Sequence, residues 1–207
     1  MIYLYAMDIL RLEPTLDSYR GMVPESRLYQ LSVLPQREQQ LGLAAELLFQ
    51  RAVRRHCREM PLPVSRDKAP GGKPYLLGRP DFHFNLSHSG VWAVCAVADA
   101  PVGVDIQQLR PVTVKIERQF SPAEQQRLLA LSGEERTEEL FDLWVQKEAF
   151  IKCTGEGLTR SLRGFEGAHP EPGYSTQLVE FPAAGYHLAV CVQEEEPSEV
   201  QMIIMPM

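Results

Sequence analysis

Residues 102–107 read Val-Gly-Val-Asp-Ile-Gln and place two polar side chains in an apolar stretch. In an extended strand, residues two apart share a face, so Asp105 and Gln107 would point to the same side while their apolar neighbours face the core. A carboxylate and an amide oxygen side by side could ligate a hard cation such as magnesium. The ordinary alternative is a strand end with polar residues in solvent.

A second group lies in residues 140–153, where apolar residues occupy nearly all sides of a predicted helix and indicate that it is buried. Within it, Trp144, Glu148, Ile151 and Lys152 fall on one face, and the two charged residues are four apart. Burying either charge alone would cost several kcal/mol, so both need partners or a metal. The alternative is an exposed salt bridge, which contributes about 0.3–0.5 kcal/mol.

A third group is the segment 85–90, Asn-Leu-Ser-His-Ser-Gly, with Gly-Lys-Pro upstream at 72–74. A turn that offers hydroxyls, backbone N–H groups and an imidazole is a plausible phosphate cradle. Lys73 could close over the same anion. Taken singly, His88 would be an ordinary hydrogen-bonded turn histidine and Lys73 a solvated lysine.

Helices and strands that would position these groups follow from periodicity and from Pro and Gly. The pattern predicts a first strand at 1–8, a helix over 35–59 and a Pro- and Gly-rich loop over 64–81. Short turns then separate three strands, which we interpret as an antiparallel meander: 82–86, 91–98 and 102–106. Helices beginning at Ser121 and at about 137 follow, and the last strands are expected at about 176–181, 186–193 and 200–205.

The order of elements occurs twice, helix before strands, and Ala-Val-Cys at 93–95 is echoed at 189–191. This repetition predicts an α+β fold of two similar halves, each with a small antiparallel sheet packed by helices. We place the N-terminal half at residues 1–102 and the C-terminal half, with the metal site, at 103–207.

Composition excludes several classes of protein. Of the 207 residues, 44% are hydrophobic and 23% charged, which is typical of a soluble globular protein, and no apolar stretch approaches a membrane span. The four cysteines are far apart, so a zinc site or a disulfide framework is not expected and a reducing, cytoplasmic location fits. A formal charge of −6 argues against a general nucleic-acid binder but leaves room for a small anionic ligand.

Together the three groups resemble the Sfp-type 4′-phosphopantetheinyl transferase superfamily. Its pattern has a Gly-Lys-Pro loop before Asn-x-Ser-His-Ser, then a Gly-x-Asp-x-Glu strand, and then a Trp-x-x-Lys-Glu-(Ala/Ser)-x-x-Lys helix. The corresponding segments occur here in the same order and at similar separations, at 72–74 with 85–89, 103–107 and 144–152.

The resemblance implies two halves related by a pseudo-twofold axis, with coenzyme A in the cleft between them. It implies transfer of 4′-phosphopantetheine to a serine of an apo acyl or peptidyl carrier protein, with release of 3′,5′-ADP. A monomer would suffice, and neither a membrane nor a nucleic acid is an expected partner.

By position, the resemblance also implies roles for single residues. Asp105 and Glu148, with Gln107 beside them, would hold Mg²⁺ against the pyrophosphate. The 3′-phosphate end of coenzyme A would be bound by Lys73, Ser87 and His88, and Asn85 of the same group would also contact coenzyme A. Glu148 is the first choice for the general base and Glu124 a lesser one, and Lys152 would stabilise the phosphate charge or protonate the leaving oxygen.

Two departures from the family pattern stand out. Gln107 replaces the usual second acid and brings no charge, so we expect metal binding to be weaker or to be completed by water. Leu41 and Gly42 stand where an arginine for the 3′-phosphate is expected, and Arg37 is a possible substitute.

Residues 106–123 form a candidate docking surface for an acidic carrier, because this segment contains three basic residues, Arg110, Lys115 and Arg118, and only one acid, Glu117. A solvated linker with scattered charges is the alternative. For the whole chain two other functions stay open: a coenzyme A-binding module without activity, and a metal-dependent phosphohydrolase using Asp105 and Glu148.

Overall fold

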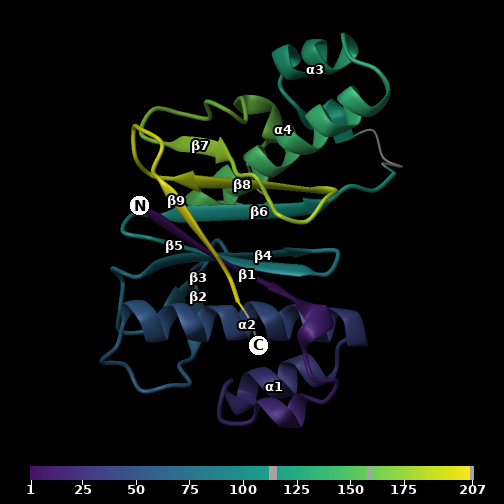
Figure 1. The fold of residues 1–207 in the computed structure, drawn as a ribbon. Coiled ribbons are helices and arrows are strands. Elements are labelled where there is room, and N and C mark those ends of the chain that lie inside the picture. The colour runs from purple at the N-terminus through teal and green to yellow at the C-terminus, as the bar shows by residue number, and fades with distance from the viewer. Residues whose placement is uncertain (112–115, 158–159, 206–207) are drawn as a thin grey trace.

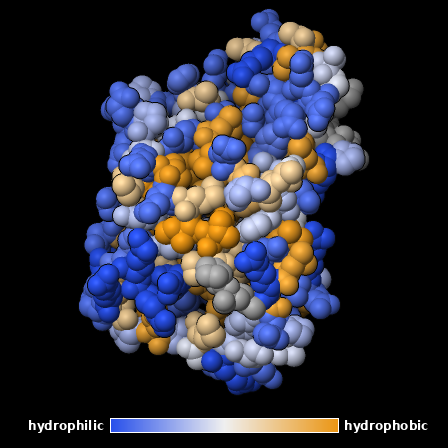
Figure 2. Space-filling model, in the orientation of Figure 1, coloured by the Kyte–Doolittle hydropathy of each residue, from blue (hydrophilic) through white to orange (hydrophobic). Residues whose placement is uncertain are grey.

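The structure is a computed structural model that describes residues 1–111, 116–157 and 160–205. Two β-sheets are stacked in its centre, with one long helix on the outer side of each (Figure 1). Hydrophobic residues at the surface gather mainly across the middle of the face shown in Figure 2, at the level of the sheets. No helix in the described ranges is long and apolar enough to cross a membrane.

The first sheet has the strand order β4-β5-β1-β9. Its strands are β1 (Ile2–Asp8), β4 (His83–Ser89), β5 (Trp92–Ala98) and β9 (Val200–Ile204). Neighbouring strands are antiparallel except β1 and β9, which are parallel. Its outer side is covered by α2 (Gln36–His56), and α1 (Glu25–Ser32) lies beyond α2 (Figure 1).

The second sheet is antiparallel, with the order β6-β8-β7. Its strands are β6 (Val102–Gln108), β7 (Ser175–Leu178) and β8 (Tyr186–Val192), and α4 (Gly133–Thr154) packs on its outer side. The helix α3 (Pro122–Leu129) contacts α4, and the hairpin β2 (Arg66–Lys68) and β3 (Pro74–Leu76) precedes β4. Short 3₁₀ helices occupy Ile9–Arg11, Leu16–Tyr19, Ile116–Gln119 and Leu162–Gly164.

Alternating side chains of the strands build separate cores on the two faces of each sheet. In β1, Leu4 packs against the second sheet whereas Tyr5 packs toward α2. In β8, Val190 faces the first sheet whereas Ala189 faces α4. The stacked sheets and their two helices therefore form one continuous molecule of four layers.

The structure confirms an α+β fold with small sheets packed by helices. The pseudo-twofold axis and the division at residue 102 stay predictions, and β9, close to the C-terminus, pairs with β1 near the N-terminus. The expected three-stranded meander is wrong in its last strand: β4 and β5 pair as predicted, but β6 leaves this sheet and pairs with β8. The helix expected from about residue 137 begins earlier, at Gly133.

Candidate functional site

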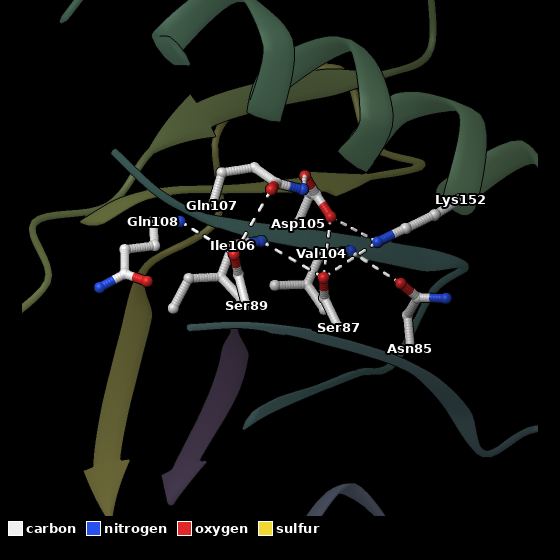
Figure 3. A network of polar contacts seen from close by, with 9 residues as sticks. All are labelled: Asn85, Ser87, Ser89, Val104, Asp105, Ile106, Gln107, Gln108 and Lys152. Atoms are coloured by element: carbon white, nitrogen blue, oxygen red, sulfur yellow. Dashed lines mark hydrogen bonds and ion pairs between the residues drawn. The ribbon is translucent and has the colours of Figure 1, made fainter. Parts of the chain in front are cut away.

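A seam of hydrogen bonds joins β4 of the first sheet to β6 of the second (Figure 3). Side chains of β4 take the place of a backbone ladder and accept hydrogen bonds from alternate N–H groups of β6. The oxygen Oδ1 of Asn85 accepts from Val104 at 3.0 Å, Oγ of Ser87 from Ile106 at 3.4 Å, and Oγ of Ser89 from Gln108 at 3.0 Å. The predicted phosphate residues Asn85 and Ser87 therefore also hold the two sheets together.

Asp105 lies at the centre of this seam and is 2% exposed. Its Oδ1 accepts a hydrogen bond from Ser87 at 2.8 Å and forms an ion pair with Nζ of Lys152, which also donates to Ser87 at 3.0 Å. Its Oδ2 accepts from Nε2 of Gln107 at 3.0 Å, so Asp105 and Gln107 share one face of β6, as predicted.

Close packing of β6 on α4 brings Asp105 to the helix. A Cβ atom on Gly103 would lie 2.0 Å from the carbonyl oxygen of Ala149, so only glycine permits this approach. This close approach of the helix backbone explains why a glycine stands two residues before Asp105.

Glu148 lies one helical turn before Lys152 on α4. Its pKa is raised, first by burial and then by the negative charge of Asp105, while Lys152 lowers it. The structure thus joins four of the predicted site residues by hydrogen bonds and an ion pair, namely Ser87, Asp105, Gln107 and Lys152. Glu148 lies one turn from Lys152, within the electrostatic influence of Asp105.

The donors at this point fit a magnesium ion in chemical type. The negative charge of Asp105 raises the cost of ionising Glu148, and a divalent cation between the two carboxylates would offset that repulsion. The described residues contain no group of three His, Cys, Asp or Glu side chains suited to a metal. Gln107 could supply a third oxygen beside the two carboxylates, and its Oε1 accepts from the hydroxyl of Ser89 at 3.5 Å.

Lys73 lies beside the seam, in a loop packed against the end of α4. A Cβ atom on Gly71 would lie 1.9 Å from the carbonyl oxygen of Gly155, and Nζ of Lys73 donates to the carbonyl of Cys153 at 2.6 Å. Burial lowers the pKa of Lys73. A cavity of about 240 Å³ adjoins this loop and is also lined by Asn85 and Lys152.

His88 lies on β4 next to the same cluster. Its pKa is lowered by desolvation and then by the positive charge of Lys152. At the turn after β4, Nη2 of Arg37 donates to the carbonyl of Gly90 at 2.9 Å, which places the beginning of α2 near this turn. A role for Arg37 at the 3′-phosphate stays a prediction.

Glu124 lies in a different buried group. It closes a capping box with Ser121 at the beginning of α3, and its Oε1 accepts from the backbone N–H of Gly167 at 2.8 Å. Its Oε2 lies 2.7 Å from Nζ of Lys147. These contacts give Glu124 a structural role, and a part in proton transfer stays a prediction.

Lys147, to which the sequence analysis assigned no role, is fully buried on α4. Its ammonium donates to the carbonyl of Leu162 at 2.8 Å and to that of Phe165, and it lies over the ring of Phe165, 4.4 Å from the centroid. The signal in the sequence was a lysine directly before Glu148 in a helix with apolar residues on all sides.

Of the predicted docking residues, Lys115 lies outside the described residues. Oε1 of Glu117 lies 3.9 Å from Nη2 of Arg136, so this acid forms an ion pair with α4. The docking surface stays a prediction.

Comparison with a family model finds similarity in a part of the chain that includes the segments 103–107 and 144–152 but not 72–74 or 85–89. The family model of the 4′-phosphopantetheinyl transferase superfamily matches residues 101–200. The chain is 42% identical over 140 residues to 4′-phosphopantetheinyl transferase psf-1 of Bacillus pumilus. The aligned segment covers 62% of this chain and 60% of that protein. It is 36% identical over 145 residues to 4′-phosphopantetheinyl transferase Sfp of Bacillus subtilis (strain 168), which covers 64% of this chain and 65% of the relative.

A further 4′-phosphopantetheinyl transferase of Bacillus subtilis is 43% identical over 112 residues, which is 54% of this chain and 49% of that protein. The matched segments thus span between about half and two thirds of the length of these relatives. These findings confirm the resemblance that the three motifs indicated.

Proposed function

We infer that this chain, a relative of the Sfp-type 4′-phosphopantetheinyl transferases, moves the phosphopantetheine arm of coenzyme A to a serine of an apo acyl or peptidyl carrier protein. The product released is 3′,5′-ADP. One observation supports the proposal: Asp105 and Lys152, which come from two of the family's motifs, form an ion pair at a seam where a third motif supplies Ser87. Glu148 lies one helical turn before Lys152 on α4.

Coenzyme A would lie along the seam, between halves that we propose to be related by a pseudo-twofold axis. The halves would meet near residue 102, with residues 1–102 binding the nucleotide and 103–207 carrying the metal site. The cavity beside Lys73 and Asn85 opens next to Lys152, so phosphates bound there would lie within reach of both lysines. His88 would donate to the 3′-phosphate.

Magnesium would be held by Asp105, Gln107 and Glu148, whose oxygen atoms are of the type this ion prefers. When bound, the ion would neutralise charge on the pyrophosphate of coenzyme A. Because Gln107 carries no charge, the protein would contribute two negative charges to this site.

Side chains of α4 would carry the proton and charge chemistry. Glu148 would accept the proton of the carrier serine, and a pKa raised by burial and by Asp105 makes a carboxylate a stronger base. Lys152 would stabilise the charge that develops on the leaving phosphate or protonate its oxygen. Ser87, which contacts both Lys152 and Asp105, would orient them.

The acidic carrier would dock on the basic segment 106–123, through Arg110, Lys115 and Arg118. We propose that the protein acts as a monomer in the cytoplasm, without membrane or nucleic acid. The composition and the scattered cysteines support this location.

Intact-mass spectrometry of an apo carrier protein, incubated with the chain, coenzyme A and Mg²⁺, tests the proposal. We expect the carrier mass to rise by one phosphopantetheine group. Cleavage of coenzyme A without modification of the carrier would instead indicate a phosphohydrolase. Binding of coenzyme A with neither change would indicate a binding module.

A further inference from the structure

A second polar cavity lies far from the seam, between α1, α2 and β2. Its volume is about 450 Å³. Both helices lie on the side of the first sheet that faces away from α4 (Figure 1). Three cationic side chains line it together with two hydroxyls and two carboxylates: Arg27, Arg66, Lys68, Ser26, Ser65, Glu46 and Asp67.

Glu46 is 2% exposed and forms an ion pair with Arg66. Nε and Nη2 of Arg66 donate to Oε2 of Glu46 at 3.2 and 3.1 Å, and Nε2 of Gln50 donates to Oε1 at 2.9 Å. Both oxygens of the carboxylate therefore have close partners that are not Arg27.

The guanidinium group of Arg27 is only partly satisfied by hydrogen bonds and ion pairs. Its Nη1 donates to Gln30 at 3.2 Å, but its Nε lies 3.6 Å from Oε2 of Glu46. Within the described ranges this Nε is buried and has no hydrogen-bond partner. Burial and then the positive charge of Arg66 lower the pKa of Arg27. Because Glu46 already accepts from Arg66 and Gln50, it cannot fully satisfy Arg27, whose side chain is 28% exposed. An anion in the cavity would supply an acceptor to the exposed part of this side chain.

We propose that this cavity is a binding site for a small phosphate-bearing anion, held by Arg27, Arg66 and Lys68. Guanidinium groups match the geometry of phosphate oxygens, and the hydroxyls of Ser26 and Ser65 line the same space. Of the acids in the wall, Glu46 is paired with Arg66, and Oδ1 of Asp67 accepts the backbone N–H of Lys68 at 2.8 Å. The charged side chains of the wall sum to +1, from three cations and two acids.

The site is separate from the proposed coenzyme A cleft. The cavity beside Lys73 and Lys152 shares none of these lining residues. The anion would accordingly bind in the presence of coenzyme A, and the inference stands whether or not the chain is a transferase.

Isothermal calorimetry with inorganic phosphate and with pyrophosphate, at constant ionic strength, tests the site on the full chain. Arg27→Gln removes the incompletely paired cation and leaves the Glu46–Arg66 pair in place. We expect it to weaken anion binding at least tenfold. Arg58→Gln, at an exposed arginine outside the cavity, is the matched control and should bind like the wild type.

Lys68→Gln is a second variant, at an exposed side chain, should Arg27→Gln fail to fold. It should weaken binding by a smaller factor. Equal affinity in Arg27→Gln and wild type, or no binding to wild type, would overturn the proposal. So would equal losses in Arg58→Gln, which would indicate a general charge effect. Loss of anion binding in saturating coenzyme A would also overturn it, because the anion would then occupy the coenzyme A site.

Discussion

The helix α4 carries two lysines, each paired with a carboxylate of another element, and the two pairs differ in what surrounds them. Lys147 and Glu124 have side chains that are 0% and 5% exposed, and the ammonium is enclosed by two backbone carbonyls and an aromatic ring. Lys152 is 28% exposed, lines a cavity, and shares Asp105 with Ser87. The first pair is closed to solutes, whereas the second can exchange partners with a ligand.

Five positions on one helix thus separate a structural ion pair from a proposed catalytic one. Burial lowers the pKa of Lys147, and Glu124 opposes that shift. The acid beside the second pair, Glu148, has a raised pKa. A charged residue on a buried helix is therefore interpreted correctly only when the element that covers it is known.

The largest effect is expected at Glu148. Glu148→Gln keeps the shape of the side chain but deletes its charge, and should lower the transfer rate by about three orders of magnitude, the scale of general-base catalysis. Initial rates of carrier modification measure it. The exposed Glu134 of the same helix provides the control Glu134→Gln, which should keep the wild-type rate. Near-normal turnover in Glu148→Gln would remove this residue from the mechanism.

Breaking the buried Lys147–Glu124 pair should lower the stability of the fold. Lys147→Met leaves Glu124 buried without its cation and should cost about 3–5 kcal/mol of unfolding free energy. Lys147→Met with Glu124→Gln removes the unpaired charge but keeps a side-chain oxygen for the N–H of Gly167, and should recover part of that loss. Urea unfolding of both variants measures the difference. A single variant within about 1 kcal/mol of wild type would mean that the pair is not sealed as described.

The open site should distinguish coenzyme A from dephospho-coenzyme A. Lys73→Ala and His88→Ala should each weaken coenzyme A binding by about tenfold, and dephospho-coenzyme A binding less, because both are assigned to the missing phosphate. Calorimetry with the two ligands is the measurement. The ammonium of Lys73 donates to the carbonyl of Cys153. If Lys73→Ala weakened binding of both ligands equally, Lys73 would stabilise the end of α4 and would not contact the 3′-phosphate.

The smallest effect is expected at Gln107. Gln107→Glu would add a second carboxylate on the face of β6 that carries Asp105, and should lower the Mg²⁺ concentration at half-maximal activity several-fold. Magnesium titrations of both proteins decide this. An unchanged midpoint would mean that residue 107 does not face the ion.

Local elements could be predicted from the sequence, but their partners could not. Periodicity located β6 and α4 and put Asp105 and Gln107 on one face, because alternation along a strand is a local property. It did not reveal that β6 leaves the first sheet, since pairing with β8 joins residues about 80 positions apart. The same limit hid the sealed pair, because Lys147 meets Glu124 only after α3 packs on α4.

Transfer rates of the pair-replaced variant, Lys147→Met with Glu124→Gln, test the central claim most directly when set beside those of Glu148→Gln. Both are measured by carrier mass at a temperature where urea unfolding shows each to be folded. The account predicts that the pair-replaced protein keeps its rate within about tenfold, while Glu148→Gln loses about three orders of magnitude. An equal loss of transfer rate in both folded variants would contradict this account and would indicate that Glu124 takes part in proton transfer.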